Sequence, residues 1–231
     1  PILMSCIASG AHVVFPTPAG YRGEGVFDNF WKLIERWQVT FLITDRDGPI
    51  NPNELERLRF AIAGPDEDDF DYYVQDRDVA GASFKAGNNR WKYTFTDPLP
   101  MDAQGSYSIT VEGRNTVTIN PNTTKARDVR DQAQNYLMSF PVTDETAVAR
   151  RSIVSDAKCE TCHGNLSLHG DNRNEATACV TCHQPGATDE EVRDPDDEGD
   201  LAQTIGMKFM IHTIHAGEAL ESGHTVHGYR G

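Results

Sequence analysis

The sequence predicts a mainly β N-terminal domain, a sandwich or barrel, followed by an irregular domain with short helices. From Gln38 to about Pro141, short segments with a two-residue hydrophobic period alternate with stretches rich in Gly, Pro, Asn and Asp. Several short strands at this spacing are typical of an antiparallel sandwich or barrel. Beyond Thr143 this period ends, and seven of the eight histidines lie at or after residue 163. The second domain is therefore expected to form around something other than an apolar side-chain core.

Residues 1–37 are predicted to be an atypical N-terminal segment. In VFDNFWKLIERW, residues 26–37, the apolar side chains recur at helical spacing, which predicts one amphipathic helix. The lone Cys6 stands among apolar and small residues. Because a free cysteine behaves as a small hydrophobic side chain, we expect Cys6 to be buried and unreactive.

The antiparallel β-domain is predicted to span residues 38–143. Its expected strands are 38–44, 57–63, 71–75, 90–96, 106–112 and 115–120. In the fourth of these, Trp91, Tyr93 and Phe95 alternate on one face, and aromatic side chains at such positions usually form core. A short helix across residues 146–158 is expected to lead into the second domain, which runs from residue 144 to residue 231.

The composition limits the kinds of partner that the protein can bind. The chain has 231 residues and a formal net charge of −14 at pH 7. Such a surface repels phosphate backbones, so we exclude nucleic acid and favour basic or cationic partners. No apolar run is long enough to span a bilayer, and no transmembrane segment is expected. The chain begins at Pro1 without the charged and apolar regions of a signal peptide, so we expect either a removed signal or a fragment.

The second domain contains two Cys-x-x-Cys-His motifs, CETCH at 159–163 and CVTCH at 179–183. One interpretation is a zinc-stabilised binding module. Residues 163–178 separate the two cysteine pairs, a spacing that four-cysteine zinc sites also have. The zinc ligands would be Cys159, Cys162, Cys179 and Cys182. This interpretation leaves the histidine that ends each motif without a role.

Covalent haem attachment gives every residue of both motifs a role. Two cysteines separated by two residues can add to the two vinyl groups of one porphyrin, and the next residue then lies beneath the iron as an axial ligand. Each motif is therefore expected to bind one haem c, with His163 and His183 as proximal ligands. The candidates for the two distal positions are His169, His212, His215, His224 and His227.

His212 and His215 are three residues apart in MIHTIH, so we expect them to share a helix face. Two further interpretations stay open. A dithiol oxidoreductase would have one CxxC at a helix N-terminus inside a βαβ unit, which the doubled motif and the β-rich surroundings do not fit. In a chimera without haem, the β-domain would fold while the second half stayed disordered, because residues 156–206 contain few apolar side chains.

Three stretches together resemble the outer-surface decahaem c-type cytochromes of metal-reducing bacteria, the MtrC/OmcA type. They are VTFLITDRDGPINPNELERLRFAIAGP, CETCHGNLSLHGDNRNEATACVTCHQPG and MKFMIHTIHAGE. The resemblance covers about residues 38–231. It implies a Greek-key β-domain, a sandwich or split barrel, followed by a multihaem domain that is truncated here after the second haem motif, leaving two haems c. By this resemblance the distal ligands come from His169, His212 and His215.

The same resemblance implies a function. It is electron transfer through two bis-histidine c-type haems, as part of extracellular respiration to metal oxides or flavins. The expected partners are other multihaem cytochromes, and the expected electron acceptors are metal oxides, metal chelates or flavins. The protein would be exported, either to the extracellular side of the outer membrane or to the periplasm. It would be an electron carrier or a component of a terminal metal reductase rather than a conventional enzyme, with no catalytic side chain.

Residues 1–40 resemble a different family. The stretch SGAHVVFPTPAGYRGEGVFDNFWKLIERWQVT is similar to a piece of an AMP-forming acyl-CoA synthetase. It lacks the phosphate-binding loop and the catalytic lysine motif of such enzymes. The resemblance therefore implies an inactive fragment and a fused reading frame.

Overall fold

The computed structural model describes most of the chain beyond residue 37. The described residues are 38–41, 43–45, 48–66, 72–77, 79, 81, 84–87, 90–194, 201–221 and 223–228. The amphipathic helix expected at 26–37, the environment of Cys6 and nearly all of the segment that resembles a synthetase lie outside these residues.

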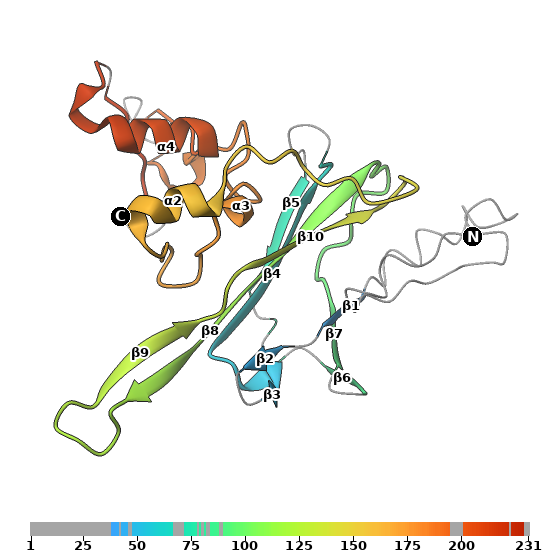
Figure 1. The fold of residues 1–231 in the computed structure, drawn as a ribbon. Helices are drawn as coiled ribbons and strands as arrows, with labels where there is room; N and C mark the ends of the chain where they lie inside the picture. Colours follow the sequence, from blue (N-terminus) through green and yellow to red (C-terminus); the bar gives the residue numbers. More distant parts are fainter. Residues whose placement is uncertain are drawn as a thin grey trace, which may run out of the picture.

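The described elements are ten strands and six short helices (Figure 1). The strands are β1 (Gln38–Phe41), β2 (Thr44–Asp45), β3 (Gly48–Pro49), β4 (Arg57–Gly64), β5 (Tyr72–Asp76), β6 (Phe84–Gly87), β7 (Arg90–Thr94), β8 (Ser106–Ile119), β9 (Arg127–Gln132) and β10 (Tyr136–Pro141). The helices are α2 (Asp156–His163), α3 (Ala176–Cys179) and α4 (Met207–Ala216), with 3-10 turns η2 (Pro52–Glu54), η3 (Glu190–Val192) and η4 (Gly217–Ala219). The predicted fold class, a mainly β part followed by short helices, is confirmed.

An antiparallel five-stranded sheet forms the centre of the β part. Its strand order is β10-β8-β4-β5, and β9 pairs with the second half of β8. A smaller sheet has the order β1-β7-β6. The registers place Phe60 opposite Val111 and Ile62 opposite Ile109, so β4 and β8 present their apolar side chains to the same face.

Aromatic side chains join the two sheets. Phe60 is fully buried, and its ring centroid lies 5.1 Å from that of Phe41 and 5.5 Å from that of Tyr93. Both pairs are edge to face, the arrangement that the aromatic quadrupole favours. The prediction that the aromatic side chains of residues 90–96 form core is confirmed for buried Tyr93 and for Phe95, which is half-buried but packs against the same cluster. Trp91 is half-buried outside this cluster.

The β8–β9 ribbon extends away from the body of the sheet (Figure 1). Residues 106–112 and 115–120 were expected as two strands, but the structure has one strand of 14 residues over Ser106–Ile119. The reason is that Gly113 continues the ladder opposite Leu58 instead of forming a turn. Beyond Arg114, β8 pairs with β9 on one side only, which leaves both strands of the ribbon exposed.

The prediction of a helix across residues 146–158 is wrong. The structure begins α2 at Asp156, with Ser155 as its N-cap residue. The chain before it follows the sheet without helical turns, and the Val148 N–H donates to Ser106 Oγ at 2.9 Å. Asp156 in turn accepts from the N–H and the hydroxyl of Thr177, at 3.1 and 2.9 Å. These contacts place the first cysteine motif inside the helix instead of after it.

An apolar cluster attaches the second part of the chain to the sheet. Ala63 of β4 is fully buried against Ala176, Val180 and Met207. Thr110 of β8 adds a buried hydroxyl contact of 2.7 Å with Thr181. Through these contacts α2, α3 and α4 lie together beside one end of the large sheet (Figure 1).

Candidate functional site

The first cysteine motif occupies the last two turns of α2. Cys162 and His163 follow Cys159 by three and four residues, so both lie on the side of the helix that carries Cys159. Cys159 is half-buried in the apolar cluster around Ala63, while Cys162 and His163 are exposed. His163 is the last helical residue, and Gly164 ends the helix with a φ of 70°, which favours glycine.

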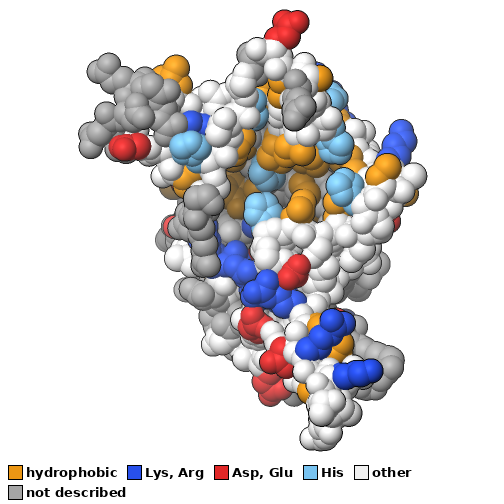
Figure 2. All heavy atoms as spheres, turned by 90° about the vertical axis from the view of Figure 1, so that its left-hand side faces the viewer, with side chains coloured by type: hydrophobic (Ala, Val, Ile, Leu, Met, Phe, Trp, Pro, Cys, Tyr) orange, Lys and Arg blue, Asp and Glu red, His pale blue; other side chains and the backbone are white. Residues whose placement is uncertain are grey.

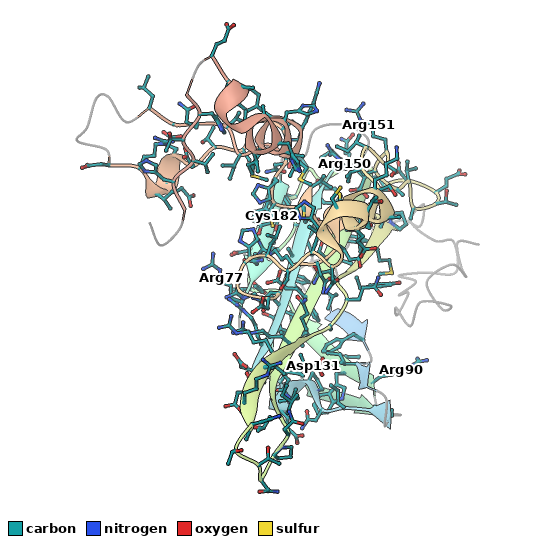
Figure 3. The ribbon with its side chains drawn as sticks, turned by 60° about the vertical axis from the view of Figure 1, so that its left-hand side comes forward. Arg77, Arg90, Asp131, Arg150, Arg151 and Cys182 are labelled. Atoms are coloured by element: carbon teal, nitrogen blue, oxygen red, sulfur yellow. The ribbon has the colours of Figure 1, made fainter. Side chains whose placement is uncertain are left out.

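The second cysteine motif begins at Cys179, the last residue of α3, and continues through the turn that follows. The His183 N–H donates to the Cys179 carbonyl at 2.9 Å, and the Met207 N–H donates to the His183 carbonyl at 2.8 Å. The Cys182 thiol donates to the Tyr73 hydroxyl of β5 at 3.0 Å, so this cysteine lies against the sheet (Figure 3). The motif is thereby connected both to α4 and to the β part.

The histidines of the two motifs each face a second histidine. The ring centroids of His163 and His215 lie 6.1 Å apart, with perpendicular planes. Those of His183 and His169 lie 5.9 Å apart, with planes inclined by 32°. The structure therefore pairs one motif histidine with a helix residue of α4 and the other with a loop residue.

Two of these imidazoles are oriented by backbone carbonyls. His183 Nδ1 lies 2.8 Å from the Ile205 carbonyl, and His215 Nδ1 lies 2.8 Å from the Ile211 carbonyl. Because a carbonyl oxygen only accepts, Nδ1 carries the hydrogen in both rings and Nε2 keeps its lone pair. Histidines that bind metals usually have this arrangement.

A loop of left-handed residues presents His169. His169, Gly170 and Asp171 have φ values of 54°, 74° and 60°, and L side chains rarely adopt this region. The Asn172 side chain donates to the His169 carbonyl at 2.7 Å. From the ribbon, Arg130 binds Asp171 at 3.1 Å, and Arg114 donates to the Gly170 carbonyl.

Burial keeps the second histidine pair neutral. It lowers the pKa of His169 to about 4, with a further contribution from Arg173, although part of the His169 ring faces solvent. It also lowers the pKa of His183, while the hydrogen bond to Ile205 acts in the opposite direction. At neutral pH both rings are therefore imidazoles, the form that binds metals.

Cys179 and Cys182 do not have the lowered pKa of a reactive dithiol. Burial raises the pKa of Cys179 to about 11, and it also raises the pKa of Cys182, whereas reactive dithiols have lowered values. In the described part of the chain, which includes all four motif cysteines, no three Cys, His, Asp or Glu side chains converge as one metal site would require.

The remaining histidines have other surroundings. His212 lies on α4 with His215, as predicted, and is exposed. His224 Nε2 lies 3.2 Å from the Thr204 carbonyl, and its ring contacts Phe209 at a centroid distance of 5.0 Å. The His227 N–H donates to Asp189. Among the described residues, neither His212 nor His224 has its ring paired with that of a second histidine.

Apolar side chains surround the histidines on the outer face of this region. Phe209 and Ile214 of α4 are 50% and 65% exposed, and Leu168 beside His169 is 48% exposed. Figure 2 shows hydrophobic and histidine side chains gathered in one hollowed part of the surface. Such a patch is typical of a binding surface rather than of an ordinary solvent-exposed face.

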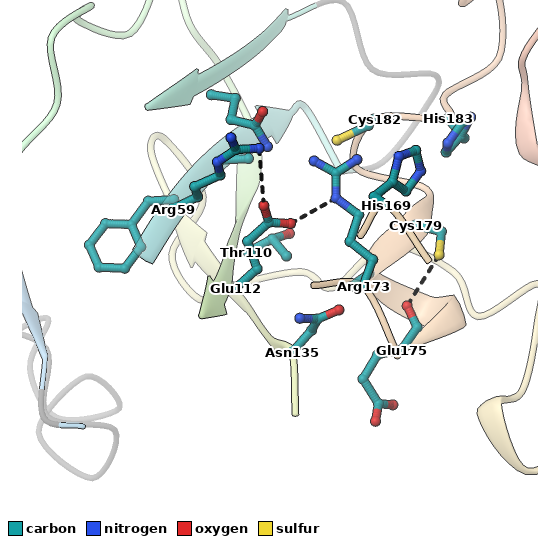
Figure 4. Close-up of a pocket in the computed structure, with 14 residues that line it drawn as sticks. Arg59, Thr110, Glu112, Asn135, His169, Arg173, Glu175, Cys179, Cys182 and His183 are labelled. Carbon is teal, nitrogen blue, oxygen red and sulfur yellow. Dashed lines mark hydrogen bonds and ion pairs between the residues drawn. The ribbon is translucent and has the colours of Figure 1, made fainter. Parts of the chain in front are cut away.

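A buried ion-pair cluster lies under the second motif. Glu112 of β8 accepts from Arg173 Nε at 2.7 Å, and its other carboxylate oxygen lies 3.7 Å from Arg59 of β4. Its side chain is only 6% exposed. The Arg173 guanidinium lies between Glu112 and the group formed by His169 and Cys182 (Figure 4). The sequence reasoning did not identify any of these charged residues.

Asp189 connects the segments that follow the second motif. It accepts from Arg193 Nε at 2.8 Å and Nη2 at 2.7 Å, and from the N–H groups of Gln203 and His227 at 2.7 and 2.8 Å. Side-chain exposure is 2% for Asp189 and 8% for Arg193. The hydrogen bonds from Arg193 hold the pKa of Asp189 well below its ordinary value.

We expect Asp189→Asn to destabilise the protein by about 3 kcal/mol, because it removes the negative charge that pairs with the buried guanidinium of Arg193. A carboxyl group with a lowered pKa contributes its full stability above the ordinary value of about 3.9 and loses it as the pH falls below that value. The variant should therefore have a lower urea midpoint at pH 7 and a weaker acid dependence below pH ~4. An unchanged midpoint, with exposed Glu190→Gln as the control, would contradict this.

Two CxxCH motifs whose histidines each face a second histidine are typical of c-type cytochromes with more than one haem. Residues 151–230, about a third of the chain, match the family of outer membrane cytochromes described as MtrC/MtrF-like, domains II/IV. This part of the chain is therefore similar to that cytochrome family, and the predicted resemblance is confirmed over residues 151–230.

Two other comparisons complete this result. The crystal structure of MtrC from Shewanella baltica OS185 is similar, with 20% sequence identity and a TM-score of 0.47. The match covers 66% of this chain and 28% of that chain, so the present sequence spans well under half of its relative. A comparison with curated proteins finds no match. Among the described residues, no helix has the length and hydrophobicity needed to cross a membrane.

Proposed function

We propose that the protein transfers electrons through two bis-histidine c-type haems, as part of extracellular respiration to metal oxides or flavins. The observation that carries this proposal is the pairing of each motif histidine with a second histidine, His163 with His215 and His183 with His169. Residues 144–231 would form the haem domain, and residues 38–143 the β-domain that supports it.

The spacing of the paired rings fits the proposed ligation. Ring centroids about 6 Å apart leave room for one metal atom with a metal–nitrogen bond of about 2.0 Å on either side. In His183 and His215, Nδ1 is hydrogen-bonded to a backbone carbonyl, so the lone pair that can bind a metal is the one on Nε2. His183 would thus be a proximal ligand with its ring fixed by Ile205, and His215 a distal ligand fixed by its own helix.

The cysteines would hold the two cofactors. Cys159 and Cys162 would form the thioether bonds of the first site, and Cys179 and Cys182 those of the second. Haem c, when bound, supplies reversible one-electron chemistry at its iron. Cys159 and Cys179 pack into the same apolar cluster, so the two attachment sites are neighbours. This proximity supports transfer of electrons between the two sites.

The exposed apolar side chains on the outer face also support the proposal. Leu168, Phe209 and Ile214 lie in the segments that carry the paired histidines, and the cost of exposing them falls if porphyrin faces cover them. We propose an electron carrier or a component of a terminal metal reductase. The family match further supports other multihaem cytochromes as partners, metal oxides, chelates or flavins as acceptors, and a location at the outer membrane surface or in the periplasm.

The test is the intact mass and the reduced-minus-oxidised visible spectrum after expression with a periplasmic cytochrome c maturation system. We expect two covalent haem masses and a low-spin spectrum, because four histidines are paired around two positions. The control is Cys159→Ala/Cys162→Ala, which should carry one haem mass. A wild-type chain without added mass, in a host that matures a known cytochrome c, would overturn the proposal.

A further inference from the structure

The second haem site has a buried charge cluster that can act on its electrochemistry. Glu112 and Arg173 are joined by a charge-assisted hydrogen bond of 2.7 Å, with side-chain exposures of 6% and 18%. Arg59 lies 3.7 Å from the same carboxylate and is 19% exposed. Charges at such depth are screened less by solvent than charges on the surface, so their effect on a neighbouring group is larger.

Arg173 is the member of the cluster that lies next to the second motif. Together with His169, Cys182 and His183 it lines one pocket between the sheet and α3. In Figure 4 its guanidinium extends from Glu112 toward His169 and Cys182, while the Glu175 carboxylate points away. Glu175 instead accepts from the exposed Gln134 side chain at 2.7 Å.

The cluster carries a surplus of positive charge. Two guanidinium groups, Arg59 and Arg173, share one carboxylate, Glu112. The first motif has a different environment, since its own helix carries Asp156, Lys158 and Glu160 on half-buried or exposed positions. The two haem sites therefore differ in the electrostatic field that the chain produces at each of them.

A positive charge beside a redox centre disfavours the oxidised state, which carries one positive charge more than the reduced state. We propose that Arg173 raises the reduction potential of the haem attached at Cys179 and Cys182 above that of the haem attached at Cys159 and Cys162. Arg173 is thus a tuning residue, and Glu112 both positions it and limits its effect. This inference rests on the proposed function. Its consequence is that an electron shared by the two sites resides mainly at the second.

The test is spectroelectrochemical titration of the holoprotein with Arg173→Gln. We expect one of the two one-electron transitions to move to lower potential, by roughly a tenfold change in its equilibrium constant, which is about 59 mV for one electron. The other transition should stay in place. Arg173→Lys keeps the charge and should restore most of the shift, which a merely structural role would not do.

Two further variants make the result decisive. Glu112→Gln should move the same transition to higher potential, because it removes the negative charge that offsets part of the effect of Arg173. Arg127→Gln, on the exposed ribbon, should move neither transition. If the Arg173 variants keep two haems but both transitions stay in place, the inference is wrong and the proposed function stands. If the wild-type chain holds no haem, the proposed function itself fails.

Discussion

Replacing His215 with alanine is expected to remove about half of the low-spin haem signal while leaving both covalent haems attached. In the proposed ligation His215 is the distal ligand of the first site alone, because its ring centroid lies 6.1 Å from that of His163. The thioether bonds depend on the cysteines and not on the distal ligand, so the mass should not change. Electron paramagnetic resonance and the visible spectrum measure the lost fraction.

The same variant can be placed in a background that isolates each site. With Cys179→Ala/Cys182→Ala only the first haem remains, and His215→Ala should then remove all of the low-spin signal. His169→Ala should have no effect in that background, because its partner is His183 of the second motif. The control is His212→Ala, three residues before His215 on α4 and without a histidine partner in the described part of the chain. A reversed result would show that the two distal assignments are exchanged.

Strands with a clear alternation of hydrophobic and polar side chains could be predicted from the sequence. Residues 57–63 and 90–96 alternate in hydrophobicity, and both form strands, β4 and β7. Residues 127–132, RDVRDQ, gave no signal, because β9 is exposed on both faces and owes its structure to pairing with β8. Strand formation there depends on a partner strand, which a hydrophobic pattern does not record.

The motif residues and a pool of candidate partners that includes His169 and His215 could be predicted, but not which partner faces which motif histidine. The CxxCH spacing depends only on local chemistry, so it identifies Cys159, Cys162 and His163 and their counterparts directly. The position of His169 depends on Arg114 and Arg130, which contact its loop from 40 to 56 residues earlier in the chain. Contacts of that range have no periodic signature in a single sequence.

The buried charged residues beneath the second motif could not be predicted for the same reason. Arg173 and Glu112 are 61 residues apart and belong to segments that look like a polar loop and an ordinary strand. Only the fold shows that both are shielded from solvent and face each other. The residues most accessible to sequence reasoning are thus those that bind the cofactor, and the least accessible are those that set its environment.

A reciprocal pair of asparagines holds the His169 loop against the sheet. The Asn135 N–H donates to Asn174 Oδ1, and the Asn174 N–H donates to Asn135 Oδ1, both at 2.9 Å. The Asn135 side-chain amide also donates to the Asn172 carbonyl at 2.7 Å. All three asparagines are buried, so each of these groups depends on its partner within the protein.

Replacing Asn135 with alanine is therefore expected to cost about 2–4 kcal/mol, because two buried backbone groups of the loop lose their partners. Urea unfolding of the holoprotein, followed by far-ultraviolet circular dichroism, measures the loss. Since Asn172 also fixes the His169 carbonyl, the low-spin signal of the second site should weaken before the sheet unfolds. The adjacent Gln134→Ala, an exposed position, is the matched control and should change stability by less than about 0.5 kcal/mol. Equal midpoints for the two variants would show that the loop is held by the haem and the arginines rather than by the asparagine pair.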